Sequence, residues 1–71
     1  MRKLKELTEY RAFNGLSRQD VAEQFGVSAV TVWRWEAGER FPSLRHLPQV
    51  ARLVGKSIED LLDGYETETR A

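Results

Sequence analysis

The chain has 71 residues, a length that forms one small domain and buries only about 60% of the surface that the unfolded chain exposes. It contains no cysteine, which excludes a disulfide framework and a zinc site built on cysteine ligands. The formal net charge is zero, but residues 1–58 hold ten Lys or Arg against six Asp or Glu, and residues 59–71 hold one Arg against five acidic residues. A mildly basic domain therefore precedes an acidic tail.

The N-terminal residues predict a helix and no membrane segment. Residues 1–6 are basic but are followed by polar rather than apolar sequence, which excludes a signal peptide and a membrane span. We therefore expect a cytoplasmic protein without a membrane partner. Large apolar residues then recur on one side of a helix, at Leu4, Leu7, Tyr10 and Phe13. The pair Asn14-Gly15 ends this helix.

Residues 18–35 carry apolar, small and glycine residues at the offsets that two helices crossing through a three-residue turn need. Ser17 is placed to cap the first of these helices, with Asp20 at its third position. Its inner face is formed by Val21, Ala22 and Phe25. Gly26 ends the helix, because a left-handed residue costs least without a Cβ. The small side chain of Ala22 permits the close approach that a helix-turn-helix requires.

The second helix of this motif is predicted to present a surface to solvent. Ser28 caps it, Val27 turns back into the core, and Val32 and Trp35 form its inner face. The opposite stripe consists of Val30, Trp33, Arg34 and Ala37, with Ala29 at its exposed N-terminal end. A helix about 10–12 Å across fits the major groove of B-DNA, which is ~12 Å wide. We expect this stripe to contact base pairs.

Two further helices complete the predicted fold. The fourth helix is expected after Ser43 and ends at Gly55. Pro48 costs a backbone hydrogen bond if Ser43 is the cap and nothing if Pro48 is itself the first helical residue, so we expect a distorted start. Its apolar repeat consists of Leu44, Leu47, Val50, Ala51 and Val54. Ser57 with Asp60 caps a last short helix, residues 58–63, which Gly64 closes. We therefore expect a domain over residues 1–64 and a short flexible tail over residues 65–71.

Four segments carry a resemblance to a known family. They are residues 15–22 (GLSRQDVA), 26–28 (GVS), 34–40 (RWEAGER) and 42–44 (PSL). In order and spacing they resemble the Cro and phage-repressor family of helix-turn-helix proteins, also called the XRE type, over the chain from Leu7 to Leu62. The resemblance implies an all-α fold, a compact five-helix DNA-binding domain that usually acts as a dimer.

The stripe and the resemblance together predict the DNA contacts. We expect base contacts from Ala29, Val30, Trp33 and Arg34. We expect phosphate contacts from Arg18, Thr31, Arg40 and Ser43. Arginine pairs in a bidentate manner with guanine O6 and N7, and the N-terminus of the helix that begins at Arg18 favours a phosphate. The alternative for Arg18 and Arg34 is a charge that only contacts solvent.

The resemblance also implies which residues support the motif. Arg11 and Glu36 are expected to meet across the first and third helices and to hold the reading helix at its angle, and Trp35 is expected to face the core. Ala22 and Gly26 complete this support. An unrelated, solvated Arg and Glu would give the same sequence, so the pairing of Arg11 with Glu36 is an expectation for the structure to test.

Some positions depart from the family pattern. At Trp33 the family usually has a small or polar residue, and this ring can lie over the sugar-phosphate edge, contact thymine methyl groups or mark a protein-binding patch. Ala29 and Val30 replace amides, so contacts to thymine methyl groups are expected in place of amide contacts to adenine. His46 is the only histidine and is expected at the surface or facing phosphate rather than in a metal site.

Two functions fit these residues, and neither is enzymatic. No nucleophile elbow, phosphate-binding loop or pair of catalytic carboxylates occurs, and no cofactor is expected. The first function is a sequence-specific regulator of transcription that binds double-stranded DNA, such as a repressor, a phage or plasmid control protein, or an antitoxin, with a toxin or RNA polymerase as a possible partner. The alternative is a protein-interaction module that docks through Val30, Trp33 and the C-terminal helix. The outward stripe favours DNA.

A homodimer is expected through the C-terminal helix. Its large apolar residues exceed what one inward face needs. They are Ile58, Leu61, Leu62 and, just beyond Gly64, Tyr65. Burial of all four within one chain is the alternative.

Overall fold

The computed structural model describes residues 2–63, which are almost entirely helical. The helices in chain order are α1 (Lys5–Asn14), α2 (Arg18–Phe25), α3 (Ala29–Ala37) and α4 (Leu47–Val54). Residues 58–63 form a further helical segment, and no strand occurs between residues 2 and 63. The predicted all-α fold with five helices is therefore confirmed.

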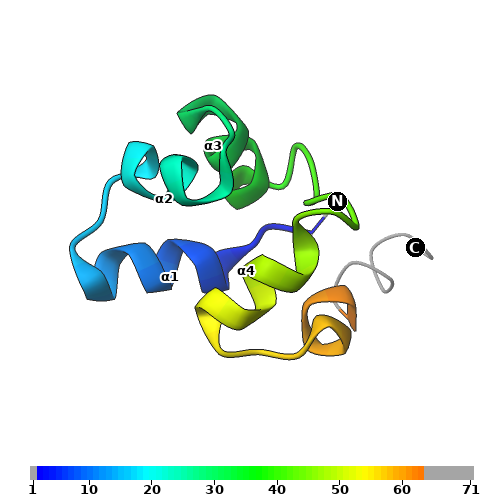
Figure 1. Ribbon diagram of the computed structural model, residues 1–71. Coiled ribbons are helices and arrows are strands. Elements are labelled where there is room, and N and C mark those ends of the chain that lie inside the picture. The colour runs from blue at the N-terminus through cyan, green and yellow to red at the C-terminus, as the bar shows by residue number, and fades with distance from the viewer. Residues whose placement is uncertain (1, 64–71) are drawn as a thin grey trace.

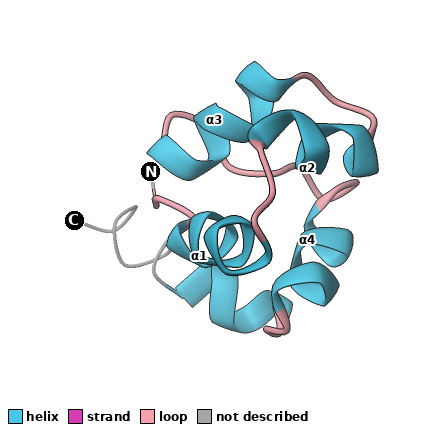
Figure 2. Cartoon of the chain, turned by 90° about the vertical axis from the view of Figure 1, so that its left-hand side faces the viewer, coloured by secondary structure: helices cyan, strands magenta, loops and turns pink. Residues whose placement is uncertain are grey.

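The helices form two layers. In Figure 1, α2 and α3 lie above α1 and α4, with residues 58–63 in the lower layer. The view turned by 90° in Figure 2 shows the same separation. α3 packs against both α2 and α1, and α1 packs against α4. α3 therefore packs against α1 in the lower layer and against α2 within its own layer.

The core lies between the two layers. The side chains that form it come from all four helices, from the segment before α1 and from the last helical segment: Leu4, Leu7, Val21, Ala22, Phe25, Val32, Trp35, Leu47, Val50, Ala51 and Leu61. The rings of Phe25 and Trp35 meet edge to face, with their centroids 5.6 Å apart. The backbone N–H of Leu4 donates to the Trp35 carbonyl oxygen at 3.2 Å. The N-terminal segment is thereby fixed to the end of α3.

The predicted caps of α2 and α3 are confirmed. The Ser17 hydroxyl accepts from the backbone N–H of Asp20 at 3.0 Å, and the Asp20 carboxylate accepts from the backbone N–H of Ser17 at 2.9 Å. Ser28 Oγ accepts from the Thr31 backbone N–H at 3.1 Å. Gly26 has a φ of 68°, and open space surrounds the position where a Cβ would stand. Gly26 is therefore required for its backbone conformation and not for packing.

The start of α4 differs from the expected repeat. Leu44 does not belong to the helix but to a turn over residues 44–46, and its side chain is exposed. The backbone N–H groups of His46 and Leu47 both donate to the Ser43 carbonyl oxygen, at 2.9 and 2.8 Å. A helix that began at Leu44 would place Pro48 in its interior, where the missing N–H loses a hydrogen bond. Starting α4 at Leu47 places Pro48 in the first turn, where this loss does not arise.

The first helix also corrects one expectation. Leu4 and Leu7 are fully buried, but Phe13, predicted on the same apolar side, is 91% exposed. It lies in the last turn of α1 and lines an open hollow together with Tyr10, Val54 and Lys56. The apolar repeat of α1 extends one turn further than the part of the helix that its neighbours cover.

Candidate nucleic-acid interface

The outward face of α3 is apolar at its N-terminal half and basic beyond it. Val30 is 56% and Trp33 is 41% exposed, and Arg34 is exposed beside them. Val32 and Trp35 point the other way, into the core, as predicted. Ala29 is only half-buried and packs against the core, so the expectation that it stands at a fully exposed end was wrong in part. Ala29 lies in the first turn of α3, directly after the Ser28 cap, and the core partly covers its small side chain.

Arg34 has no partner of its own in the described part of the chain. Within residues 2–63 no hydrogen bond or ion pair engages its guanidinium group. Its backbone carbonyl, in contrast, accepts from the N–H groups of Glu39 at 2.9 Å and Arg40 at 3.2 Å. The end of α3 therefore fixes the backbone of Arg40 close to Arg34 and leaves both guanidinium groups available to a ligand.

Four of the predicted DNA-contacting residues line one hollow. This hollow, of about 260 Å³, lies between α3 and residues 40–46. Its lining consists of Thr31, Arg34, Trp35, Arg40, Phe41, Ser43 and His46. Two guanidinium groups and two hydroxyls provide hydrogen-bond donors and positive charge, which is the chemistry that a phosphate diester prefers.

A buried carboxylate connects the motif to α1. Arg11 donates from Nε to Glu36 Oε2 at 2.7 Å and from Nη2 to Oε1 at 3.1 Å, which confirms the predicted pair. The hydrogen bonds to Glu36 raise the pKa of Arg11 above its ordinary value. Arg11 also donates to the Leu16 carbonyl oxygen at 3.1 Å. One side chain thus ties α1, the loop before α2 and α3 together.

Arg18 contacts the same carboxylate, which the sequence did not predict. Its Nε donates to Glu36 Oε1 at 3.0 Å, whereas a contact to phosphate was expected. The side chain of Arg18 remains 43% exposed, while that of Glu36 is 4% exposed. Arg18 therefore still presents part of its guanidinium group to solvent at the start of α2.

His46 is less exposed than expected for a surface residue. Its ring centroid lies 6.4 Å from that of Phe25 and 5.7 Å from that of Trp35. Its Nδ1 lies 3.4 Å from Ser43 Oγ, a long hydrogen bond at the edge of the hollow. The imidazole therefore connects the hollow to the aromatic core. The half-buried Phe41, which also lines the hollow, was missed by the sequence reasoning, although its place directly before Pro42 is a signal for an ordered loop.

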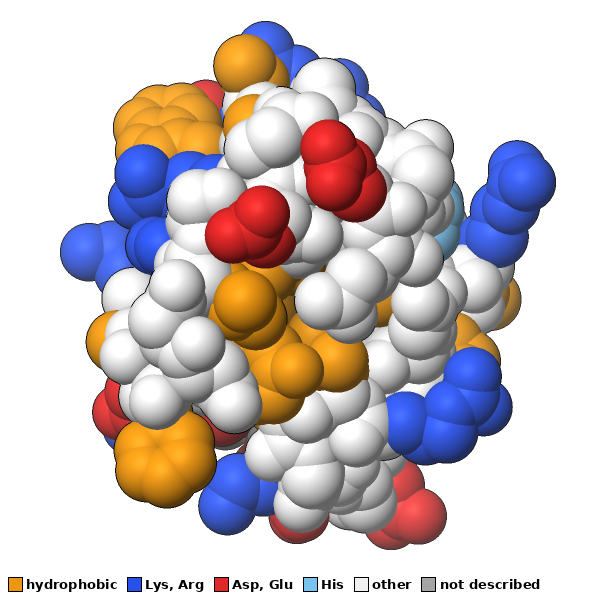
Figure 3. Space-filling model, turned by 60° about the vertical axis from the view of Figure 1, so that its left-hand side comes forward, with side chains coloured by type: hydrophobic (Ala, Val, Ile, Leu, Met, Phe, Trp, Pro, Cys, Tyr) orange, Lys and Arg blue, Asp and Glu red, His pale blue; other side chains and the backbone are white. Residues whose placement is uncertain are grey.

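Charge is distributed unevenly over the surface. The face in Figure 3 carries Lys and Arg side chains at its margins, and two acidic side chains lie close to an apolar area at its centre. This side of the molecule is not uniformly basic. Positive charge available to a nucleic acid comes instead from individual side chains such as Arg34 and Arg40.

The predicted dimer residues are separated by the structure. Leu61 is fully buried in the core of one chain, so its assignment to an interface was wrong. Ile58 is partly exposed, and Leu62 is half-buried. Tyr65 lies outside the described residues. The helical segment turns Leu61 toward α4 and the core, and only its flanking apolar residues are left near the surface.

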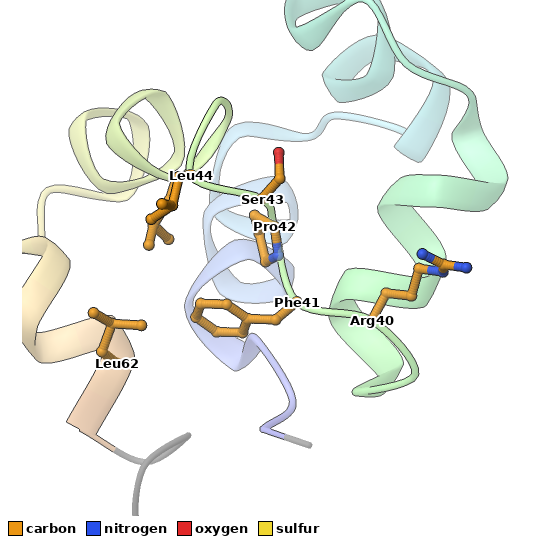
Figure 4. Close-up of a pocket in the computed structure, with 7 residues that line it drawn as sticks. Arg40, Phe41, Pro42, Ser43, Leu44 and Leu62 are labelled. Carbon is orange, nitrogen blue, oxygen red and sulfur yellow. The ribbon is translucent and has the colours of Figure 1, made fainter. Parts of the chain in front are cut away.

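Leu62 lines a groove of about 370 Å³ that it shares with residues 40–44 and Leu47. In Figure 4 the side chains of Phe41, Leu44 and Leu62 are directed toward one another, and those of Arg40 and Ser43 point away. The groove and the phosphate-suited hollow therefore have the same loop as a common wall, apolar on one side and polar on the other.

The described residues contain neither a metal-binding cluster nor a membrane helix. Between residues 2 and 63, no three His, Cys, Asp or Glu side chains are grouped to hold a metal ion. In the same range, no helix has the length and apolar character needed to cross a bilayer.

Comparison with known proteins identifies relatives across nearly the whole chain. A family profile described as a helix-turn-helix domain matches residues 3–71. The chain is 38% identical over 56 residues to an uncharacterized HTH-type transcriptional regulator of Methanocaldococcus jannaschii, an alignment that covers 79% of this chain and 85% of that protein. It is 36% identical over 55 residues to another uncharacterized HTH-type transcriptional regulator, of Archaeoglobus fulgidus, with 78% and 79% covered.

A third relative is longer. The HTH-type transcriptional activator BcrR of Enterococcus faecalis is 30% identical over 66 residues, which cover 93% of this chain and 32% of the activator. The chain therefore spans about a third of the length of that protein. No solved structure gives a significant match.

Proposed function

The chain belongs to the helix-turn-helix domain family, and on that premise we propose that it is a transcriptional regulator that binds double-stranded DNA and reads the major groove with α3. Its relatives named as transcriptional regulators support this proposal. The observation that carries it is the unpaired Arg34 guanidinium on the exposed face of α3, directly beside the hollow that Arg40 and Ser43 line.

In this proposal the two sets of residues have separate tasks. Val30, Trp33 and Arg34 enter the major groove, where Arg34 donates two hydrogen bonds to guanine O6 and N7. Thr31, Arg40 and Ser43 hold the adjacent phosphates, and half-buried Ala29 contributes at most the edge of its methyl group. Arg18 reaches phosphate when it exchanges its contact with Glu36 for one with the DNA backbone.

For the direction of regulation we favour repression. Repression requires only that the protein occupies a promoter and blocks RNA polymerase. The relative that is named an activator aligns with this chain over about a third of its own length. A reporter gene placed downstream of the selected site distinguishes repression from activation, because repression lowers its expression and activation raises it.

We further propose that two chains bind one operator. The groove between residues 40–44 and Leu62 offers an apolar surface for a second copy, and the exposed side chain of Leu44 forms part of this surface. A second copy that docks in this groove through a two-fold axis adds its own α3 and its own hollow to the assembly. A two-fold arrangement of this kind places half-site centres about 34–36 Å apart.

A protein-interaction function is the second candidate. The exposed pair Val30 and Trp33 favours it, since large apolar side chains on a solvent-facing helix also suit a protein partner. The DNA-binding and protein-interaction functions differ in their ligand, and the following experiment tests DNA binding directly.

The experiment is selection of bound duplexes from a random pool at two salt concentrations. A DNA regulator enriches one motif at both concentrations, with half-sites about 10–10.5 base pairs apart for a dimer. A pool that stays random at both concentrations contradicts the DNA function and favours the protein-interaction module.

A further inference from the structure

On the exposed face of α3, the side chains of Val30, Trp33 and Arg34 offer methyl groups and hydrogen-bond donors but no hydrogen-bond acceptor. We propose that these three side chains therefore select the keto bases, with contacts to guanine O6 and N7 and to thymine O4 and its methyl group, and that they make no hydrogen bond to the amino groups of adenine or cytosine. This inference rests on the proposed DNA-binding function and specifies which base atoms that function uses.

The chemistry of the exposed side chains leads to this inference. Val30 presents only methyl groups, and both Trp33 and Arg34 donate hydrogen bonds but cannot accept them. Arg34 has no partner within residues 2–63, so all its donors are available. The face thus combines an apolar N-terminal half with a cationic donor one turn further along.

The acceptor atoms close to this face belong to residues outside the outward stripe, and Thr31 lines the hollow together with Arg40 and Ser43. Ser28 Oγ and Thr31 Oγ1 lie 3.0 Å apart and share one hydrogen bond, and Ser28 Oγ also accepts from the Thr31 backbone. The Glu36 carboxylate is buried and holds Arg11 and Arg18. Glu39 follows the end of α3 at Gly38, on the side away from the helix N-terminus.

The four bases differ in how well their major-groove edges match these side chains. Guanine offers two acceptors, and thymine offers an acceptor and a methyl group. Cytosine presents an amino donor only, and adenine presents an amino donor beside one acceptor, N7, so a bidentate arginine finds both of its acceptors only at guanine. A donor that faces an amino group leaves both groups unpaired, and an amino group that faces Val30 loses its water without gaining a partner. Thymine below Val30 and Trp33 and guanine below Arg34 avoid both losses.

The helix geometry sets the distance between these bases. Val30 and Arg34 are four residues apart and lie on the same side of α3, as do Val30 and Trp33 at three residues. One helical turn rises about 5.4 Å, and neighbouring base pairs are about 3.4 Å apart. We therefore expect the thymine and the guanine within two base-pair steps of each other.

The test replaces single atoms in the duplex that selection returns. Deoxyuridine for the critical thymine removes only the methyl group and is expected to weaken binding about fourfold. 7-Deazaguanine for the critical guanine removes N7 and is expected to weaken binding at least about fivefold. Purine, which lacks the amino group of adenine, is expected to change binding by less than about twofold at any adenine in the half-site.

Variants of the protein test whether Val30 makes the contact to the thymine methyl group. In Val30→Ala the deoxyuridine and thymine duplexes are expected to bind within about twofold of each other. Phe13→Ala, which removes an exposed ring from α1, is the matched control and keeps the full difference. If purine for adenine weakens binding as much as deoxyuridine does for thymine, or if neither deoxyuridine nor 7-deazaguanine has an effect, the inference is overturned. In that case the DNA function still stands, because that function fails only if no duplex is selected.

Discussion

Arg11 and Glu36 are 25 positions apart in sequence, and two hydrogen bonds of 2.7 and 3.1 Å join them across α1 and α3. The Glu36 side chain is nearly inaccessible to solvent, so these hydrogen bonds replace contacts with water. Arg18 supplies a third hydrogen bond from α2. One carboxylate on the inner side of α3 therefore connects this helix to both α1 and α2.

Glu36→Ala is expected to lower the free energy of unfolding by about 3–5 kcal/mol, because it leaves the partly buried Arg11 without its partner. Glu39→Ala, at an exposed position just after α3, is the control and is expected to change it by less than about 0.5 kcal/mol. Urea denaturation followed by circular dichroism measures both. Similar losses in the two variants would show that the buried contact contributes little.

Arg34→Ala is expected to reduce discrimination between the selected and a scrambled duplex by about 1–3 kcal/mol, because the bidentate contact to guanine is lost. Its thermal stability should equal that of the parent, since no interaction within residues 2–63 engages the guanidinium group. Arg52→Ala, at an exposed arginine on α4, keeps the full discrimination. An unchanged ratio in Arg34→Ala would remove this residue from the reading face.

Arg40→Ala is expected to weaken binding to all duplexes alike and to flatten the dependence of log K on log salt by about one unit. Arg18→Ala is expected to give a smaller change, because Arg18 must first leave Glu36 to reach phosphate. Titrations at several salt concentrations compare the two slopes. An altered base preference with an unchanged slope would instead make Arg40 a base-contacting residue.

The parent chain is expected to form dimers at high micromolar concentration in sedimentation equilibrium. Leu44→Glu places a charge at the apolar groove without touching the core and is expected to leave monomers. Phe13→Glu, at an equally exposed apolar position on α1, keeps the dimer. A monomeric parent that binds a single half-site as tightly as a palindrome would exclude the proposed dimer.

The Ser17 cap predicts a pH dependence. Hydrogen bonding of the Asp20 carboxylate to the backbone N–H and the side chain of Ser17 lowers the pKa of Asp20 below its ordinary value. Its stabilising contribution is therefore present at neutral pH and is lost as the pH falls below about 4. The difference in unfolding free energy between the parent and Asp20→Asn should shrink from neutral pH to about pH 3. A difference that stays constant or grows would contradict the role of the charged cap.

The elements that the sequence predicted correctly are those that local chemistry determines. Ser17, Asp20 and Ser28 act within three residues of their partners, and Gly26 needs only its own backbone conformation. Such signals do not depend on the rest of the fold. The α2–turn–α3 unit was therefore predictable residue by residue.

The incorrect predictions concern residues whose burial or partner depends on a neighbouring element of the fold. Apolar periodicity placed Phe13 and Leu44 on covered faces, but it does not show how far the covering helix extends or where a helix starts. Leu61 was expected at an interface, yet the last segment turns it into the core. Arg18 has two possible partners, phosphate and Glu36, and only the three-dimensional structure places the carboxylate within its reach.

Trp33 and Trp35 stand two positions apart on α3 in different environments, since Trp33 is 41% exposed and Trp35 is buried against Phe25 and His46. They are the only tryptophans in the sequence, so all indole fluorescence of the protein comes from this one helix. With Trp33→Phe, the remaining emission reports the packing of the core. With Trp35→Phe, it reports whatever approaches the outer face of α3. The domain thus carries two intrinsic optical probes, one for folding and one for ligand binding, and neither requires an attached dye.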